Sequence, residues 1–359
     1  MGIWVVRHNL LSPSGIDSVY AFAERHGFTD LFLQVRGRGD AYFRSELEPP
    51  PPGLNADFDP LDYILNHPAR ERFVIHAWVN MFYVWSEKAL PPSPLHVVRR
   101  HPEWLVKPVQ YDTSGRDTTF ASLRNTEGLF LSPQVPEARR HLLDVVSDLV
   151  RRYPVDGLHL DYIRYPGFAF DFNREGRENF RRRYIIDPLE FRGEPERFLE
   201  RFGESGYHLF FERWAEHLRD TLSSFMAELA KAVHREAPDI ILTAAVKPDL
   251  EKAHWQYYQD WDNWLAEGSL DVAIPMNYAT DNALFLRRTE RIIRACGTER
   301  VWMGVAIYNQ PAASAWTKIA AARELPLAGV VLFSYDQFRA DPALARSYQR
   351  FRTTQEDSP

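Results

Sequence analysis

The stretch Asp156-Gly157-Leu158-His159-Leu160-Asp161-Tyr162 decides the expected fold. Its leucines alternate with His159 and Asp161, so a strand here directs the polar pair to one face and the leucines to the other. The stretch follows a segment with helical periodicity, Pro136 to Arg152. A helix that turns into a short strand with polar residues at its end is typical of a βα unit in a parallel sheet.

Short apolar runs of the same kind recur along the chain, with helical patterns between them. Strands of a parallel sheet are buried on both faces and therefore form such runs. The runs are Ile3–Arg7, Asp30–Arg36, Phe73–Val79, Gly157–Asp161, Ile240–Val246, Val272–Asn277, Val301–Ile307 and Gly329–Ser334. Eight strands with intervening helices predict an α/β fold, the (β/α)₈ or TIM barrel.

Helix boundaries can be placed in three of the intervening segments. Gly27 follows apolar residues at helical spacing, and glycine is preferred just past a helix end. Asp59 stands before Pro60, a pair typical of a helix N-terminus. A longer apolar stripe predicts a helix over Leu209–Glu236.

Long connections follow the second, third and fourth runs, whereas most βα connections have about two to six residues. All three are βα loops, and this face of a TIM barrel holds the active site. We expect Tyr83–Leu131 and Gly167–Gly206 to form lids or walls over a groove. Because the chain has no repeat and no linker rich in Gly and Ser, we predict one barrel over residues 1–352 and a disordered tail over 353–359.

Composition restricts the class of partner. The 359 residues include 43 basic and 49 acidic side chains, and the net charge of −6 gives no field that would attract nucleic acid. A single cysteine, Cys296, excludes an intramolecular disulfide and a multi-cysteine zinc site. No stretch approaches the roughly 18 apolar residues of a membrane span, and no leader sequence is evident at the start. The composition does not determine an oligomeric state.

Motifs of the common cofactor sites do not occur. Gly37-Arg38-Gly39 lacks the third glycine of a dinucleotide-binding turn, and no phosphate-binding loop ends in Gly-Lys-Ser or Gly-Lys-Thr. There is no Gly-x-Ser-x-Gly elbow for a nucleophilic serine. We therefore predict no cofactor.

Carboxylates at strand ends are the candidate catalytic groups. Hydrolysis of a glycosidic bond requires a proton donor and a second carboxylate on opposite sides of that bond. Asp161 is expected to supply the central carboxylate, and the alternative is a structural ion pair with Arg164. Asp40 and Asp336 are the candidates for the second carboxylate, although Asp40 is equally suited to hold its loop by pairing with a neighbouring arginine.

Other polar and aromatic residues at strand ends are suited to bind a sugar. Amide and phenol groups bind hydroxyls, and aromatic rings offer apolar faces to sugar C–H groups, although core packing explains such rings as well. Arg36 is expected to clamp a carboxylate, either that of Asp161 or one on an acidic sugar. The full set of predicted substrate-binding residues is Arg36, Trp78, Asn80, His159, Arg164, Tyr165, Asn277, Tyr278, Tyr308 and Tyr335.

Two other classes of function remain open from the residues alone. The first is a carbohydrate-binding protein on a degenerate barrel, because no second catalytic glutamate is unambiguous. The second is a metal-dependent hydrolase or deacetylase, since His8, His76 and His159 all fall in or beside strands. A histidine in a strand is more often structural, so no metal site is predicted.

Several motifs together resemble one family of proteins. They are Gly2-Ile3-Trp4-Val5, Gln34-Val35-Arg36 with Gly39-Asp40-Ala41-Tyr42, His76-Ala77-Trp78-Val79-Asn80, His101-Pro102-Glu103-Trp104-Leu105, the stretch around Asp161 with Tyr165-Pro166, Ile274-Pro275-Met276-Asn277-Tyr278 and Phe333-Ser334-Tyr335-Asp336. With these motifs the chain resembles glycosyl-hydrolase-like family ten. These are bacterial (β/α)₈ proteins related to enzymes that act on peptidoglycan glycan strands and other polysaccharides.

The resemblance implies a hydrolase of β-linked glycans that contain amino sugars, with Asp161 at the catalytic position and an exported or periplasmic location. The same stretch is similar to the Asp-Gly-x-Asp-x-Asp-x-Glu signature of chitinases. However, His159 replaces the second acid and Ile163 occupies the position of the catalytic glutamate, which puts a chitinase mechanism in doubt. Asn80-Met81 and Leu131-Ser132-Pro133 also depart from the family's usual Asn-Pro and Asn-Pro-Gly.

Overall fold

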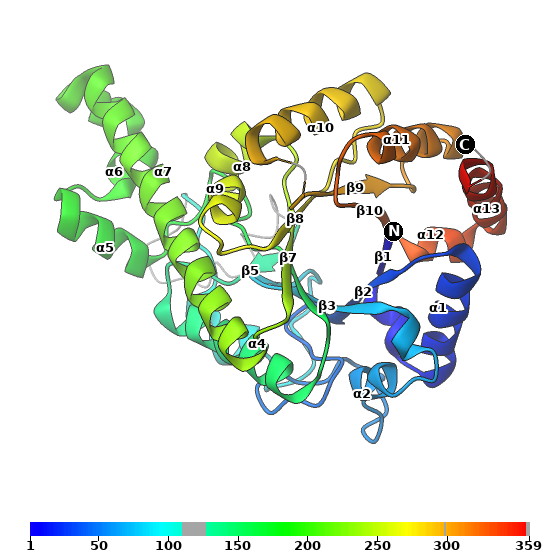
Figure 1. Ribbon diagram of the computed structural model, residues 1–359. Helices are drawn as coiled ribbons and strands as arrows, with labels where there is room; N and C mark the ends of the chain where they lie inside the picture. The colour runs from blue at the N-terminus through cyan, green and yellow to red at the C-terminus, as the bar shows by residue number, and fades with distance from the viewer. Residues whose placement is uncertain (110–126, 298, 357–359) are drawn as a thin grey trace.

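A computed structural model describes residues 1–109, 127–297 and 299–356. Eight parallel strands form one sheet in the order β8-β7-β6-β3-β2-β1-β10-β9 (Figure 1). Isolated parallel bridges, Ala273 to Val301 and Met276 to Gly304, join the two edges. The strands are β1 (Gly2–Val5), β2 (Asp30–Arg36), β3 (Val74–Asn80), β6 (Gly157–Asp161), β7 (Ile241–Val246), β8 (Val272–Pro275), β9 (Trp302–Ala306) and β10 (Gly329–Phe333). The predicted TIM barrel is confirmed, and each strand lies within two residues of its predicted bounds.

Alternation along the strands divides the core into two layers. Ile3 and Val5 pack toward the helices, whereas Trp4 points into the barrel, where it meets Phe32 and Trp78. The interior of the barrel is narrow, since a Cβ at Gly304 would lie 3.0 Å from the Trp4 ring. The interior is therefore filled by aromatic side chains, and an open space is possible only at the ends of the barrel.

Helices surround the sheet (Figure 1). They include α1 (Pro13–His26), α2 (Pro60–Leu65), α4 (Pro136–Arg152), α7 (Pro195–Glu236), α8 (Leu250–Gln256), α9 (Trp261–Ala266), α10 (Asn282–Cys296), α11 (Ala312–Glu324), α12 (Tyr335–Ala340) and α13 (Pro342–Glu356). The predicted helix ends are confirmed, because Gly27 follows α1 in a left-handed conformation and the Asp59 side chain accepts hydrogen bonds from the first turn of α2. These helices cover the outward apolar faces of the strands.

The long connection after β3 contains β4 (Tyr83–Trp85) and β5 (Leu129–Phe130), which pair antiparallel, and the short α3 (Val97–Arg100). Residues 110–126 of this predicted wall lie outside the described residues. The connection after β6 contains α5 (Arg174–Tyr184), α6 (Pro188–Arg192) and the N-terminal part of α7, which is interrupted at Gly203. In Figure 1 these helices project to one side of the barrel.

Two expectations need correction. No residue of Gly167–Gly206 lines the pocket described below, because the charged segment forms helices that extend away from the barrel mouth. The predicted disordered tail is wrong for residues 353–356, which continue α13, and residues 357–359 lie outside the described part. Within the described chain, no helix combines the length and apolar character needed to cross a bilayer.

Candidate active site

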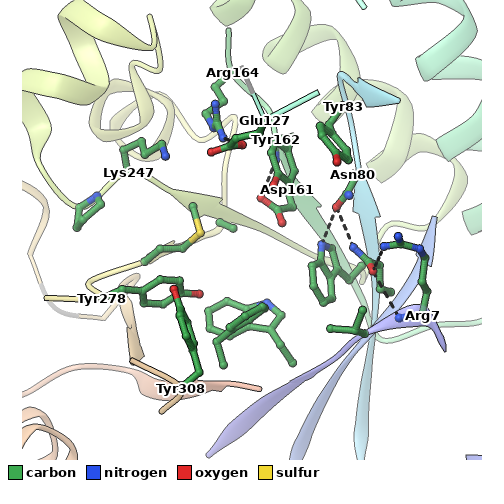
Figure 2. Close-up of a pocket in the computed structure, with 18 residues that line it drawn as sticks. Arg7, Asn80, Tyr83, Glu127, Asp161, Tyr162, Arg164, Lys247, Tyr278 and Tyr308 are labelled. Atoms are coloured by element: carbon green, nitrogen blue, oxygen red, sulfur yellow. Dashed lines mark hydrogen bonds and ion pairs between the residues drawn. The ribbon is translucent and has the colours of Figure 1, made fainter. Parts of the chain in front are cut away.

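A pocket of about 490 Å³ lies at the carboxyl ends of the strands (Figure 2). Every strand of the barrel contributes to it through its last residues or those just after it. Its lining residues are Trp4, Val6, Arg7, Gln34, Trp78, Asn80, Tyr83, Glu127, Asp161, Tyr162, Arg164, Ala245, Lys247, Pro248, Met276, Tyr278, Tyr308 and Phe333. Its volume and its mixture of aromatic and polar groups suit a small part of a carbohydrate chain.

Asp161 occupies the last position of β6 and is 8% exposed. The next residue, Tyr162, has a positive φ of 52°, which is unfavourable for a residue with a side chain. The Tyr162 backbone N–H donates to Asp161 Oδ1 over 2.7 Å. Burial raises the pKa of Asp161 to about 6, although this hydrogen bond and the positive charge of Arg164 act in the opposite direction.

Among the described residues, Glu127 is the other carboxylate that lines the pocket, and the sequence interpretation missed it. It stands just before β5, and its side chain is 53% exposed. Arg164 Nη2 donates to Glu127 Oε2 over 2.7 Å. Burial disfavours the charged form of Glu127, but the charge and hydrogen bond of Arg164 outweigh it, so the pKa of Glu127 is lowered. The only signal in the sequence was its location in the predicted wall, Tyr83–Leu131.

Arg164 is held by aromatic rings as well as by Glu127. Its guanidinium carbon lies 4.8 Å from the ring centroid of Tyr162 and 5.1 Å from that of Tyr257. The ring of Tyr162 in turn stacks on Tyr83, with 4.5 Å between the centroids. Stacked and ion-paired in this way, Arg164 keeps a fixed orientation. Its charge therefore acts on both carboxylates of the pocket.

Lys247 follows β7 on the same side of the pocket. Its Nζ lies 4.4 Å from the ring centroid of Tyr257. Burial and the nearby charge of Arg164 lower the pKa of Lys247 to about 8, against the opposing charges of Glu127 and Asp161. Below that pH the ammonium is charged and contributes a second positive group beside the carboxylates.

On the side formed by β1, β2 and β3, polar side chains form a chain of hydrogen bonds. Asn80 Oδ1 accepts from Trp78 Nε1 over 3.1 Å and from Gln34 Nε2 over 3.2 Å. Gln34 Oε1 then accepts from Arg7 Nη1 over 2.9 Å. Trp78 and Asn80, which the sequence predicted, thus line the pocket together with Gln34 and Arg7, which it missed.

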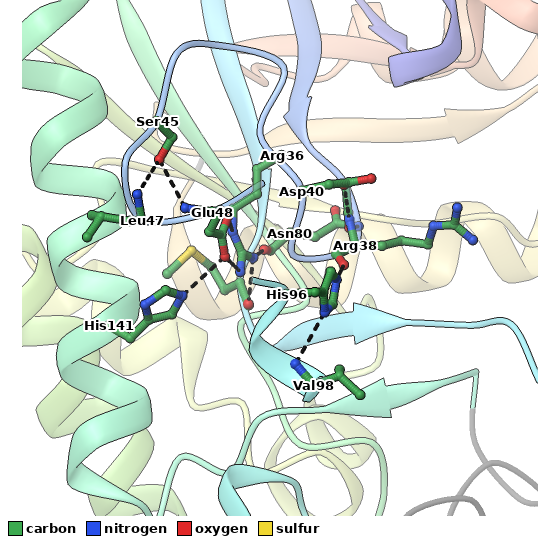
Figure 3. A network of polar contacts seen from close by, with 12 residues as sticks. Arg36, Arg38, Asp40, Ser45, Leu47, Glu48, Asn80, His96, Val98 and His141 are labelled. Carbon is green, nitrogen blue, oxygen red and sulfur yellow. Dashed lines mark hydrogen bonds and ion pairs between the residues drawn. The ribbon is translucent and has the colours of Figure 1, made fainter. Parts of the chain in front are cut away.

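Arg36 does not line the pocket. Figure 3 shows it beside Glu48, with Asn80 close by. It binds Glu48 through two hydrogen bonds, of 2.5 and 2.7 Å, and both side chains are buried. His141 Nε2 lies 3.2 Å from Glu48 Oε1. Despite burial, the Arg36 charge and the His141 contact lower the pKa of Glu48 to about 2. The carboxylate clamped by Arg36 is therefore that of Glu48, another residue that the sequence interpretation missed.

The same arginine fixes the end of β3. Arg36 Nη1 donates to the backbone carbonyl of Met81 over 2.9 Å and to that of Asn80. These carbonyls belong to the turn that carries the Asn80 side chain into the pocket. Arg36 is thus a positioning residue for the pocket wall.

Asp40 and Asp336, the predicted candidates for the second carboxylate, are not among the residues that line the pocket. Asp40 is buried and accepts a hydrogen bond of 2.7 Å from the Arg38 backbone N–H. Asp336 lies 2.6 Å from His8 Nε2 and accepts from Asn9 Nδ2 over 2.9 Å. Asp40 thus holds its own loop, whereas Asp336 links the start of α12 to the segment that follows β1. A catalytic role for either carboxylate stays a prediction.

His159 lies inside the barrel, below the pocket. Its Nε2 accepts from Trp4 Nε1 over 3.0 Å, and its Nδ1 lies 2.8 Å from Thr243 Oγ1. Burial and the neighbouring His76 hold the pKa of His159 well below its ordinary value, so the ring is neutral. The alternation of β6 correctly directs His159 inward. It stands two residues before Asp161, however, and therefore one layer deeper.

Three further residues predicted to bind substrate are buried away from the pocket lining. The Tyr165 hydroxyl accepts from Gln134 Nε2 over 2.6 Å. Asn277 Nδ2 donates to the Phe285 carbonyl over 2.9 Å. Tyr335 packs in the core. By contrast, the ring centroids of Tyr278 and Tyr308 lie 6.3 Å apart at the pocket edge, where Tyr308 is 50% exposed.

The three histidines considered for a metal site have different partners. His8 contacts Asp336, His76 lies 3.3 Å from Asp30, and His159 contacts Trp4 and Thr243. Among the described residues no group of three or more His, Cys, Asp or Glu side chains is arranged to hold a metal ion.

Solved structures share this fold. The PgaB (BpsB) glycoside hydrolase domain from Bordetella bronchiseptica superposes with a TM-score of 0.70 at 13% identity, covering 97% of each chain. The catalytic domain of the β-amylase from Paenibacillus polymyxa superposes with a TM-score of 0.62 at 12% identity, covering 100% of this chain and 98% of that one. At these identities the similarity shows the barrel fold alone.

Sequence comparison identifies relatives and a family. The glycosyl hydrolase DigH of Escherichia coli (strain K12) is 26% identical over 174 residues, which are 43% of this chain and 36% of DigH. The glycosyl hydrolase YngK of Bacillus subtilis (strain 168) is 20% identical over 278 residues, which are 71% of this chain and 47% of YngK. The chain thus spans less than half the length of these relatives. Residues 15–316 match the family described as Glycosyl hydrolase-like 10, which confirms the resemblance seen in the sequence. The chain therefore belongs to the glycosyl hydrolase-like 10 family.

Proposed function

We propose that this protein is a glycoside hydrolase that cleaves β-glycosidic bonds in a bacterial polysaccharide. Its substrate would be the glycan strands of peptidoglycan or another polymer of amino sugars. Asp161 acts as the general acid and Glu127 supplies the second carboxylate. One observation carries the proposal: Asp161 and Glu127 line the same pocket, and their surroundings displace the two pKa values in opposite directions.

The chemistry follows from these displacements. A carboxylic acid whose pKa is raised to about 6 retains its proton in mildly acidic solution and can donate it to the leaving oxygen. A carboxylate paired with Arg164 stays ionised and can attack the anomeric carbon or activate a water molecule. Tyr278 and Tyr308 offer ring faces and hydroxyls to the sugar, and Asn80 offers its amide.

The names of the relatives and the glycosidases among the structural neighbours support the reaction class. The pairing of Glu127 with Arg164 supports a second candidate function, a non-catalytic carbohydrate-binding protein, because an ion-paired carboxylate is less available for reaction. Turnover distinguishes the two candidates.

The test is the release of reducing ends from a panel of glycans, including peptide-free peptidoglycan strands and amino-sugar polymers. We expect wild type to cleave one of them, and Asp161→Asn and Glu127→Gln each to lose roughly 100-fold or more in kcat. Asp40→Asn and Asp336→Asn are matched controls, because each removes a carboxylate outside the pocket, and both should remain active. If either of these variants loses activity while Glu127→Gln keeps it, the second carboxylate is that aspartate. Binding without cleavage would favour the non-catalytic candidate, and activity abolished by a chelator would favour a metal-dependent hydrolase.

A further inference from the structure

The pocket has a second charged side, formed by Arg7. Figure 2 shows Arg7 across Asp161 from Lys247 and Arg164. The sheet order gives the same placement, because β7 adjoins β6 on one side while β3 and β2 separate β6 from β1 on the other. A sugar chain bound over Asp161 would therefore extend toward Arg7 at one end.

Arg7 carries a charge that the described part of the protein does not neutralise. Its guanidinium donates to the neutral amide oxygen of Gln34, and the Tyr42 hydroxyl is a further neutral partner. Arg164 and Arg36, by contrast, are each paired with a glutamate. No carboxylate among the described residues forms an ion pair with Arg7.

The Arg7 side chain is also held in place. Gln34, whose amide oxygen accepts the hydrogen bond from Arg7, is buried. The Gln34 amide nitrogen in turn donates to Asn80 Oδ1, which fixes the orientation of the amide. Gly37 leaves room for the Arg7 stem, since a Cβ at that position would lie 2.3 Å from Arg7 Cδ and 2.7 Å from its Nε. A guanidinium oriented before the ligand arrives binds an anion at a smaller entropic cost.

The charge of the described pocket residues differs in sign from that of the whole protein. Among the described residues, the lining includes three cationic side chains, Arg7, Arg164 and Lys247, and two carboxylates, Asp161 and Glu127. The chain as a whole has a net charge of −6. An excess of positive charge among these lining residues favours an anionic ligand.

We infer that Arg7 binds a carboxylate on the sugar chain, so that the substrate is an anionic glycan rather than a neutral or cationic one. The planar guanidinium presents paired N–H donors that match a carboxylate. A glycan carries such a group either as a uronic acid or as a lactyl ether on the ring. The inference rests on the proposed function for the identity of the ligand, but it concerns binding and not cleavage.

The test measures binding in the Asp161→Asn background, so that turnover does not interfere. Calorimetric titrations would use peptide-free peptidoglycan strands, which carry lactyl carboxylates, the same strands after amidation of those carboxyl groups, a polyuronate, and a neutral polymer of N-acetylglucosamine. We expect amidation to weaken binding by roughly 10-fold or more. Adding Arg7→Gln should weaken binding of the native strands by a similar factor and leave the amidated strands unchanged. Comparison of the polyuronate with the native strands identifies the source of the carboxylate.

Arg38→Gln is the matched control, because Arg38 is a nearby cation that pairs with Glu87 outside the pocket lining. It should bind the native strands as tightly as the background variant does. Arg7→Lys keeps the charge but loses the planar pair of donors, so intermediate binding is expected. Equal binding of native and amidated strands, an equal effect of Arg7→Gln on both, or no binding to any glycan would overturn the inference. If the wild type cleaves nothing but binding depends on Arg7 as described, the inference stands and the proposed function fails.

Discussion

Asp161 and Glu127 line one pocket, yet the pKa of Asp161 is raised to about 6 while that of Glu127 is lowered. Burial at the end of β6 causes the first displacement, and the ion pair with Arg164 outweighs burial to cause the second. Two carboxyl groups with opposite displacements can hold different protonation states at one pH, as an acid and a base in one site must.

The first prediction concerns the pH dependence of cleavage. Activity should fall as pH rises through about 6, because Asp161 then loses the proton it must donate. Activity should also fall in strong acid, where Glu127 becomes protonated. Because the pKa of Glu127 is lowered, this happens at a lower pH than for an ordinary glutamate. Lys247→Met should move the upper limb to higher pH, because the Lys247 charge lowers the pKa of Asp161. The measurement is kcat/KM against pH for both proteins. An upper limb that does not move in Lys247→Met would remove Asp161 as the group that titrates there.

A second prediction concerns Arg164. Arg164→Gln removes the charge that lowers the pKa of both carboxyl groups, so both limbs of the profile should move to higher pH. The loss in kcat/KM should therefore be largest in acid, where Glu127 becomes protonated. Arg38→Gln, which removes a cation outside the pocket lining, should leave the profile in place. A uniform loss of activity at every pH would instead indicate that Arg164 only holds the loop.

The barrel could be predicted because buried parallel strands are apolar on both faces, which makes each of the eight runs visible in the sequence. Asp161 could be predicted because alternation along a strand fixes the direction of its side chain. Alternation shows which face of the strand a side chain lies on, but it does not show how deep along the barrel axis that side chain lies. His159 points inward like Asp161, but it lies two residues earlier, and at about 3.3 Å per residue this places it in the packed interior.

Loop residues could not be placed for a different reason. Glu127 comes from a connection without periodicity, and it reaches the pocket because β5 pairs with β4 beside the barrel mouth. The segment Gly167–Gly206 was expected over the groove, but its direction depends on how α5 and α6 pack on α7, which local sequence does not encode. Tyr165, Asn277 and Tyr335 lie buried away from the pocket lining because of packing and hydrogen bonds that a strand pattern does not show.

A third prediction concerns the buried pair of Arg36 and Glu48 (Figure 3). Glu48→Gln leaves the Arg36 charge buried without a counter-ion, so the free energy of unfolding should fall by about 3–5 kcal/mol. The folded-state pKa of Glu48 is depressed to about 2, so its stabilising effect is present above the unfolded-state value of 4.5 and is lost as pH falls toward 2. In urea titrations of both proteins between pH 3 and 7, the difference in the free energy of unfolding should therefore shrink toward the acidic end. The double variant Arg36→Met/Glu48→Leu should lose less stability than the sum of the single changes, and strict additivity would contradict the pairing.

A fourth prediction joins stability to the proposed acid. The pKa of Asp161 is raised from 3.8 to about 6 on folding, so ionising this carboxyl costs stability in the native protein. The sign is opposite to that of Glu48: the stabilising contribution of protonated Asp161 is fully present below the unfolded-state pKa of 3.8 and is lost as pH rises through 6. Asp161→Asn cannot ionise, so its free energy of unfolding relative to wild type should rise by roughly 2–3 kcal/mol between pH 4 and pH 7 and then level off.

Glu127→Gln supplies the control of opposite sign, since the lowered pKa of Glu127 makes its ionised form the stabilising one. A variant that is inactive yet more stable than wild type at pH 7 would mark Asp161 as a residue retained for chemistry, because the fold alone would favour the amide. If the difference between Asp161→Asn and wild type does not change with pH, burial does not raise the pKa of Asp161, and the assignment of this residue as the acid fails.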